Sequence, residues 1–393
     1  MTSPRIAIVG AGIGGLTLAI ELRRRGLEPH IYEQTDELRE VGAAVALSAN
    51  ATRFLRDRLG VGDALAAAAA DVNGLIFRDG RSGDVVGRIL SREEYRQRCG
   101  APYYGVHRAD LQQILASALG TTGLHLGKRL VDIDDSGGAA VLRFADGDCA
   151  EADLVIGADG ARSTLRRHVA GYDDAQFSGC YGWRGVVAAE QLDLLPDPEA
   201  IQFWMGPGGH LLHYPIGGGA HNFLLVRRQD GPWPEAGWTA PGGPRDHVEA
   251  FAGWHPAVLQ MISAVHGGDR WALFHRPPLH QWSKGHVTLL GDAAHALVPH
   301  HGQGANQSIE DAVVLADLLV ESAPHDWDEA RRRYQELRLD RTRKVQIASI
   351  TTADVLHLPD GPRATARNAR LGSPDMWSRH LAWIHEHVAD AHQ

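Results

Sequence analysis

The sequence contains few cysteines and no long apolar run. Only three cysteines, Cys99, Cys149 and Cys180, occur among its 393 residues, and their spacing matches no metal-binding motif. Such a small, odd number of thiols excludes a disulfide framework and favours the reducing cytoplasm. Because no uninterrupted apolar run reaches about 18 residues, the sequence predicts neither a membrane-spanning helix nor a membrane partner.

Positive charge is also scarce. The formal net charge of −9 argues against a broad nucleic-acid surface, because phosphate binding requires clustered lysine and arginine. The basic stretch of Arg331–Arg333, followed by Arg338 and Arg341, is interpreted as a solvated helix face. His300 and His301 lie in a loop without cysteine or carboxylate partners at ligand spacing, so no metal site is predicted.

A glycine-rich turn follows the first apolar segment, residues 6–9. Gly10 permits a tight turn, Gly12 lets the backbone approach a pyrophosphate, and Gly15 lets a helix pack closely on the strand. Glu33 ends the next apolar run, about 20 residues past the turn, where a carboxylate accepts hydrogen bonds from a ribose. This pattern predicts a dinucleotide-binding βαβ unit.

The middle of the sequence has a different pattern. Strand candidates at 200–205, 210–216 and 221–226 are separated by glycine-rich turns, which predicts an antiparallel sheet. An apolar strand at 287–290 and a long helix from 305 to 321 then return to the earlier pattern. The α/β unit is therefore expected to be formed by two parts of the sequence, with the antiparallel sheet inserted between them.

We expect an α/β fold in which a Rossmann-like nucleotide-binding domain carries an inserted antiparallel-sheet domain and is followed by C-terminal helices. The nucleotide-binding domain is predicted to be discontinuous, formed by residues 1–74, 100–175 and 285–350. The β-rich domain, expected to bind the substrate, comprises 75–99 and 176–284, and residues 351–393 form the helical segment. There, Trp377, Leu381, Ile384 and Val388 recur at helical spacing and are interpreted as facing the core.

Two further glycine-rich segments indicate more specifically which kind of nucleotide-binding domain this is. They are Gly-Ala-Asp-Gly-Ala-Arg-Ser at 157–163, and Leu-Gly-Asp-Ala-Ala-His-Ala-Leu-Val-Pro at 290–299 followed by Gly-Gln-Gly-Ala-Asn at 302–306. Together with the Gly10 turn, they resemble the three fingerprints of the single-component flavin-dependent aromatic hydroxylases, which share the p-hydroxybenzoate hydroxylase fold and its GR2-type FAD-binding domain. The resemblance covers essentially the whole chain and is greatest for the salicylate hydroxylase and 3-hydroxybenzoate 6-hydroxylase branches.

The resemblance implies non-covalently bound FAD, reduced by NADH or NADPH. Oxygen then adds at flavin C4a, and the hydroperoxide hydroxylates an aromatic ring. The substrate is expected to be a small phenolic or amino-substituted aromatic acid, and a larger polyketide or antibiotic scaffold is the alternative. A non-hydroxylating flavoprotein or a nucleotide-binding protein is a further alternative. The enzyme is expected to be a monomer or a homodimer.

The resemblance also assigns cofactor-binding roles to particular residues. Asp292 would bind the ribityl chain, backbone N–H groups of Gly302–Asn306 would face the flavin N1–C2=O edge, and Arg108 would reach the phosphate or ribityl region. Arg162 is assigned to the nicotinamide cofactor. The expected FAD-binding residues are Gly10, Gly12, Ile13, Gly14, Gly15, Glu33, Gln34, Arg39, Ala46, Arg108, Val131, Asp159, Asp292, Gly302, Gly304, Ala305 and Asn306.

Hydroxylation requires a group that activates the phenol. His213 and Tyr214 are adjacent in a predicted strand, so only one of them can point toward the substrate. A histidine with an ordinary pKa can accept a phenol proton near neutral pH, which favours His213 as the catalytic base. The alternatives are a purely structural role for His213 in the sheet and a catalytic role for Tyr214.

Overall fold

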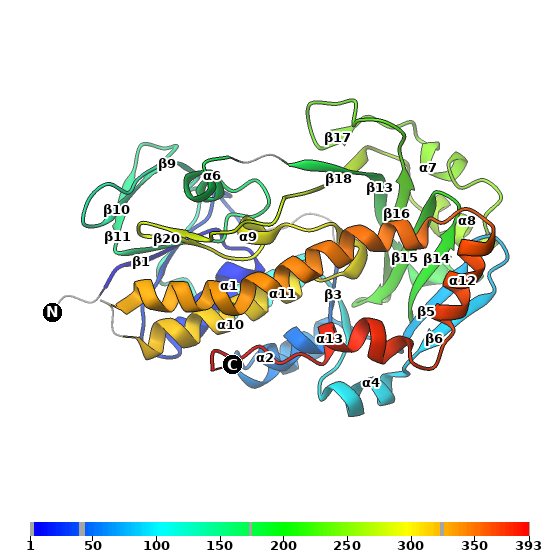
Figure 1. The fold of residues 1–393 in the computed structure, drawn as a ribbon, viewed down its shortest axis with the longest axis horizontal. Coiled ribbons are helices and arrows are strands. Elements are labelled where there is room, and N and C mark those ends of the chain that lie inside the picture. The colour runs from blue at the N-terminus through cyan, green and yellow to red at the C-terminus, as the bar shows by residue number, and fades with distance from the viewer. Residues whose placement is uncertain (1–3, 39–43, 173–174, 323–325, 393) are drawn as a thin grey trace.

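The computed structural model describes residues 4–38, 44–172, 175–322 and 326–392 (Figure 1). Its first half is built on a six-stranded sheet in the order β19-β20-β12-β1-β2-β8. The central strand β1 (Ile6–Val9) is buried along its whole length and pairs in parallel with its two neighbours. The other strands are β2 (His30–Tyr32), β8 (Leu124–His125), β12 (Leu154–Gly157), β19 (Ser283–Lys284) and β20 (Val287–Leu289).

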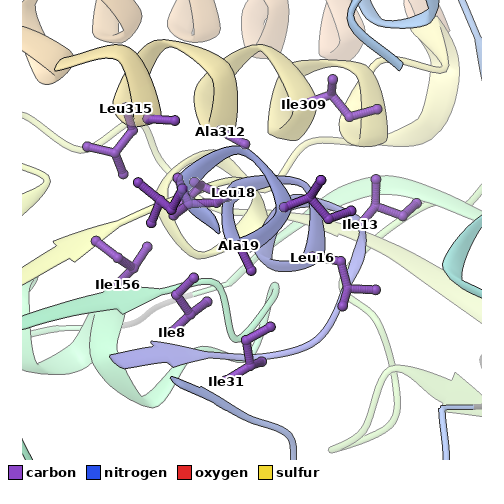
Figure 2. Close-up of a cluster of buried hydrophobic side chains, with 14 of the residues drawn as sticks. Ile8, Ile13, Leu16, Leu18, Ala19, Ile31, Ile156, Ile309, Ala312 and Leu315 are labelled. Atoms are coloured by element: carbon purple, nitrogen blue, oxygen red, sulfur yellow. The ribbon is translucent and has the colours of Figure 1, made fainter. Parts of the chain in front are cut away.

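Helix α1 (Ile13–Arg23) lies between this sheet and helix α10 (Gly304–Glu321), as Figure 2 shows. Every residue of α1 from Ile13 to Leu22 is buried, because the helix packs on the sheet through one side and on α10 through the other. A Cβ atom at Gly14 would lie 2.6 Å from Leu290 Cδ2, so a larger residue here would require the Leu290 side chain to shift. The predicted βαβ unit is confirmed, and α10 completes it from a distant part of the sequence.

The second half is built on an eight-stranded sheet in the order β17-β18-β13-β16-β15-β14-β5-β6. The predicted antiparallel hairpins are confirmed, with the exception that β14 pairs in parallel with β5. The strands are β5 (Leu75–Asp79), β6 (Val85–Ile89), β13 (Gln176–Ala188), β14 (Ile201–Gly206), β15 (Gly209–Ile216), β16 (Ala220–Arg228), β17 (Thr239–Ala240) and β18 (Arg270–His275).

Smaller elements surround the two sheets. The remaining strands form two three-stranded sheets, which are β11 (Cys149–Ala152), β10 (Ala140–Phe144) and β9 (Leu130–Asp134), and β3 (Ala44–Leu47), β7 (Tyr104–His107) and β4 (Ala70–Asp71). The helices are α2 (Ala49–Asp57), α3 (Gly62–Ala68), α4 (Arg92–Cys99), α5 (Arg108–Leu119), α6 (Thr164–Ala170), α7 (Asp246–Glu249), α8 (Pro256–Ser263) and α9 (Asp292–His295), with short 3₁₀ turns at Ala189–Gln191 and Pro299–His301.

The C-terminal helices connect the two halves. Helix α11 (Trp327–Leu356) runs from the six-stranded toward the eight-stranded sheet (Figure 1). It is followed by α12 (Pro362–Leu371), a π-helical turn (Trp377–Leu381) and α13 (Ala382–His385). The boundary predicted at residue 350 falls inside α11. Among the described residues, no helix has both the length and the apolar surface that crossing a bilayer requires.

Two expectations for the C-terminal region are wrong. Val388 is 44% exposed, because α13 ends at His385 and the helical spacing no longer applies beyond it. The arginines of α11 do not all face solvent either. Arg338 is 1% exposed and pairs with Glu310 (2.5 Å) and Asp311 (2.7 Å), because the acidic face of α10 lies directly opposite.

Candidate active site

A cavity of about 1090 Å³ lies between the two large sheets. One part of its wall comes from the glycine turn after β1 and from the loop before α10. Another part is the face of β5, β14 and β15, and the C-terminal helices cover that part from the opposite side. The volume exceeds the roughly 300–1,000 Å³ of a typical ligand pocket, which leaves room for more than one ligand.

The glycines of the first turn have distinct roles. A Cβ at Gly10, where φ is +106°, would lie 2.3 Å from the Ala158 carbonyl oxygen, and one at Gly15 would lie 2.1 Å from that of Gly10. At both positions the neighbouring backbone leaves no space for a side chain. Gly12 is different, because a Cβ there meets no atom within 4 Å while the residue lines the cavity. The N-terminus of α1 is therefore open to a ligand, and its backbone N–H groups suit a phosphate.

Two carboxylates lie along the same wall. Glu33 Oε2 accepts a hydrogen bond from the backbone of Ala11 (2.8 Å), so the side chain is fixed at the turn. Asp292 begins α9 near Arg108. Burial lowers the pKa of Arg108, and the negative charge of Asp292 opposes that shift. Carboxylates at two points of an elongated cavity can accept hydrogen bonds from sugar hydroxyls, so these residues fit a dinucleotide.

Most of the predicted FAD-binding residues line this cavity. They are Gly10, Gly12, Ile13, Gly14, Gly15, Glu33, Gln34, Ala46, Arg108, Asp159, Asp292, Gly302, Gly304 and Ala305; Arg162 lines it too. Asp159 also accepts hydrogen bonds from the backbone N–H groups of Thr164 (2.8 Å) and Leu165 (3.2 Å), so it caps α6. Arg39 lies outside the described residues.

Two predicted residues lie outside the cavity lining. Val131 is 46% exposed, because strand alternation in β9 turns Leu130 inward instead. The Asn306 side chain accepts a hydrogen bond from Ser48 N and donates one to Ala46 O, both of 2.9 Å. Asn306 therefore holds the loop before α10 against β3 rather than pointing into the cavity.

A second compartment of the cavity has an apolar wall. Its sheet side consists of Leu75, Phe77, Ile201, Phe203, Leu212 and Tyr214. Leu371, Met376 and Leu381 of the C-terminal helices also line it. Sequence reasoning placed these helices in the core but did not assign them to the site, although their apolar stripe was the signal for a buried face.

His213 does not line this compartment. Leu212 and Tyr214 point into it, so His213 points to the other face of β15, where it is fully buried. There its Nε2 accepts a hydrogen bond from Trp204 Nε1 (3.1 Å). The expectation that His213 faces the substrate is therefore wrong, and its position is that of a structural histidine in the sheet.

A different histidine lines the cavity instead. His300 is 2% exposed, and among the described residues neither of its ring nitrogens has a hydrogen-bond partner. Its ring meets that of His210 edge-on at 5.3 Å, and His210 Nδ1 lies 2.6 Å from His357 Nε2. Burial lowers the pKa of His300 to about 3, so the imidazole is neutral and can donate or accept a hydrogen bond with a bound molecule. Sequence reasoning considered His300 only as a metal ligand.

Comparison with known proteins agrees with this geometry. The family model described as "FAD binding domain" matches residues 4–349. A 3-amino-4-hydroxybenzoate 2-monooxygenase of Streptomyces platensis is 40% identical, over 97% of this chain and 96% of that protein. A 3-hydroxybenzoate 6-hydroxylase of Aquipseudomonas alcaligenes is 34% identical, over 97% of both chains.

The fold has solved counterparts. The structure of a salicylate hydroxylase substrate complex superimposes with a TM-score of 0.82 at 28% identity, over 98% of this chain and 97% of that one. The glycine turn, the two carboxylates and the family match thus agree on the cofactor. The chain belongs to the family of single-component FAD-dependent aromatic hydroxylases, and it is a flavoprotein monooxygenase.

Proposed function

We propose that this enzyme hydroxylates the ring of a small aromatic acid that carries an amino or hydroxyl group. One NADH or NADPH, one proton and one O₂ would convert the aromatic C–H into C–OH, yielding oxidised nicotinamide and one water. Relatives named for 3-amino-4-hydroxybenzoate (40% identical), 3-hydroxybenzoate (34%) and 6-hydroxynicotinate (34%) support this substrate class. The observation that carries the proposal is the apolar compartment with His300 and Tyr214 in its wall.

The chain's own residues would hold the cofactor along the cavity. The open N-terminus of α1 at Gly12 suits the pyrophosphate, Glu33 suits the adenosine ribose, and Asp292 suits the ribityl chain. The loop of Gly302–Ala305, at the start of α10, would present N–H groups to the flavin ring. When bound, FAD supplies the electron transfer and the oxygen chemistry.

Two side chains are suited to the polar groups of the substrate. Burial keeps Tyr214 a neutral phenol by raising its pKa, so its hydroxyl can donate a hydrogen bond. Because His300 is neutral and its nitrogens are available, it can accept a hydrogen bond from a ring hydroxyl. The apolar walls would exclude water from the reacting ring.

The same compartment contains a positively charged side chain that suits the carboxylate of an aromatic acid. Arg367 is buried and lines the cavity. Its guanidinium donates to the carbonyls of Val355 and Leu356 (both 3.2 Å), which fixes its position. Burial lowers the pKa of Arg367, and the charges of Asp79 and Asp360 oppose that shift. We assign the acid group of the substrate to this side of the compartment.

The substrate class can be tested with a panel of aromatic compounds. Hydroxybenzoates, aminobenzoates, amino-hydroxybenzoates and hydroxynicotinates should stimulate NADH or NADPH oxidation, and product should form in step with the nicotinamide consumed. Polycyclic phenols of similar reactivity serve as the comparison. Stimulation by the polycyclic compounds alone would exclude a small aromatic acid but not the monooxygenase class.

The mode of FAD binding can be tested by precipitation. No histidine or cysteine stands in a recognisable flavinylation motif, so we expect the flavin to be released when the yellow protein is denatured with acid. All flavin absorbance should appear in the supernatant. Flavin that stays with the washed pellet would show a covalent bond.

Two further features belong to the proposal. The three cysteines are free thiols, which supports a cytoplasmic location. The enzyme would act as a monomer or a homodimer.

A further inference from the structure

The C-terminal helices leave an opening beside the apolar compartment. After α11 the chain turns back, so that α12, the π-helical turn and α13 run beside this helix (Figure 1). Contacts at two points join the two segments. The Arg367 guanidinium bonds the carbonyls of Val355 and Leu356 near the end of α11, and the Lys344 ammonium lies 4.2 Å from the ring centre of Trp383. Between Lys344 and Leu356, α11 runs for about 18 Å.

The cavity reaches the surface between these two contacts. Residues of both segments line the cavity there, and Thr351, Arg370 and His380 among them are exposed. This opening, the window, is lined by Ala348, Thr351, Thr352 and Val355 of α11, Arg370 of α12 and His380 of the π-helical turn.

Exposed residues also line the cavity at other places. Some lie directly after Glu33, which suits the adenosine ribose, and another is Arg162, which is expected to serve the nicotinamide cofactor. The window differs from these places because Arg370 is directly followed by Leu371, which lines the apolar compartment. It therefore gives the shortest connection in the sequence between the surface and the substrate wall.

Positive charge extends from the window into the compartment. Arg370 and Arg367 are three residues apart on α12, so their side chains lie on one face of the helix. Arg370 is exposed, whereas Arg367 is buried. Among the described residues Arg370 forms no ion pair, and the next carboxylate in the sequence, Asp375, pairs with Arg379 (2.5 Å). An anion that arrives at the window therefore meets an available guanidinium first and a buried one further in.

We propose that the aromatic acid enters through the window, that its hydroxylated product leaves the same way, and that Arg370 attracts the carboxylate of the acid; this route rests on the proposed function. Arg367 then receives the carboxylate inside, while the apolar wall holds the ring. Carboxylic acids are ionised and arginines are charged at neutral pH, so the two attract each other. Such attraction raises the rate of encounter and is screened by salt.

The role of Arg370 can be tested by the rate at which the FAD-loaded enzyme binds two acids, 3-amino-4-hydroxybenzoate and 3-hydroxybenzoate, for which relatives are named. Binding without NADH or NADPH is followed by the change in flavin absorbance after rapid mixing. The neutral counterparts 2-aminophenol and phenol lack only the carboxylate. Arg370→Gln should slow association of the acids by about threefold and leave the neutral compounds unchanged, and added salt should remove the difference from wild type.

Thr351→Trp tests the route itself. The Thr351 hydroxyl donates to the carbonyls of Ile347 and Ala348 in its own helix (3.0 and 3.1 Å), so its removal should not disturb the fold. An indole at this position should obstruct the window and slow both association and release of the acids and the neutral compounds, by about tenfold. The dissociation constants should change much less, because an obstacle on the path slows entry and exit together. Flavin reduction by NADH or NADPH without substrate should keep its wild-type rate.

Arg343→Gln and Ile347→Trp are the matched controls, because both residues are exposed on α11 and neither is among the described residues that line the cavity. Both should bind the acids at wild-type rates. Wild-type association in Arg370→Gln and Thr351→Trp would overturn the route and leave the proposed function standing. Slower flavin reduction by the donor in Thr351→Trp would also overturn it, because the window would then admit the nicotinamide. If the wild-type enzyme binds neither acid and does not bind 6-hydroxynicotinate, the proposed function itself fails.

Discussion

Replacing Gly12 by valine should give a folded but colourless protein. The backbone at Gly12 (φ −73°, ψ −179°) is extended, a conformation that valine adopts freely, and a Cβ there meets no protein atom within 4 Å. The new side chain would instead occupy the space where the pyrophosphate approaches α1. Losing two amide–phosphate hydrogen bonds, at roughly 1.5–3 kcal/mol each, should weaken FAD binding by at least ~100-fold.

The measurements for Gly12→Val are the flavin-to-protein ratio after purification, the FAD dissociation constant and the circular dichroism spectrum of the apoprotein. Gly138→Val is the matched control, because a Cβ at Gly138 also meets no atom within 4 Å but the residue does not line the cavity. Gly15 cannot serve this purpose, since its Cβ would collide with the Gly10 carbonyl and disturb the fold. Wild-type FAD affinity in Gly12→Val would contradict the assignment of the pyrophosphate to this turn.

Replacing His300 by leucine should lower hydroxylation by about tenfold, the usual effect of losing a hydrogen bond that orients a bound molecule. Leucine fills a similar volume in the wall but can neither donate nor accept a hydrogen bond. FAD content and the rate of flavin reduction without substrate should stay close to wild type. Electrons that no longer reach the substrate should appear as hydrogen peroxide, so product formed per NAD(P)H consumed is the decisive measurement.

The pH dependence provides a second readout for His300. Burial lowers the pKa of His300 to about 3, so the imidazole stays uncharged at every pH well above that value. Activity in the wild type should therefore show no loss from His300 protonation between about pH 5 and 8. His213→Leu is the comparison, because His213 is equally buried but faces Trp204. That variant should lose stability while keeping its coupling ratio, and equal uncoupling in both variants would remove the special role of His300.

The sequence predicted the dinucleotide turn well because the required residues are local. Gly15 packs against the Gly10 carbonyl of the same βαβ unit, and Gly10 has a φ of +106°, which favours glycine whatever surrounds it, so the spacing of the two glycines is informative. The face of β15 on which His213 lies could not be predicted in this way. Every residue of β15 except Pro215 is buried, so both faces of the strand are covered and no polar–apolar alternation marks the face that meets the cavity.

Other parts of the site depend on contacts between distant segments. The acidic partners of Arg338 lie on α10, and nothing near residue 338 indicates them. Likewise, Leu371, Met376 and Leu381 form a wall only because α11 carries the chain across to the eight-stranded sheet. An apolar stripe shows that a helix has a buried face but does not show what covers it.

The strands of the six-stranded sheet come from two distant parts of the sequence, and this affects the order in which the fold can form during translation. β1 and α1 lie among the first residues, whereas β20 and α10 lie near residues 287–321, and the two groups pack directly on each other. During synthesis the apolar face of α1 that packs on α10 therefore stays uncovered until the whole eight-stranded sheet has been translated. A chain released before residue 304 would lack α10 and keep that surface exposed, so such fragments should aggregate or require a chaperone rather than accumulate as a smaller flavoprotein.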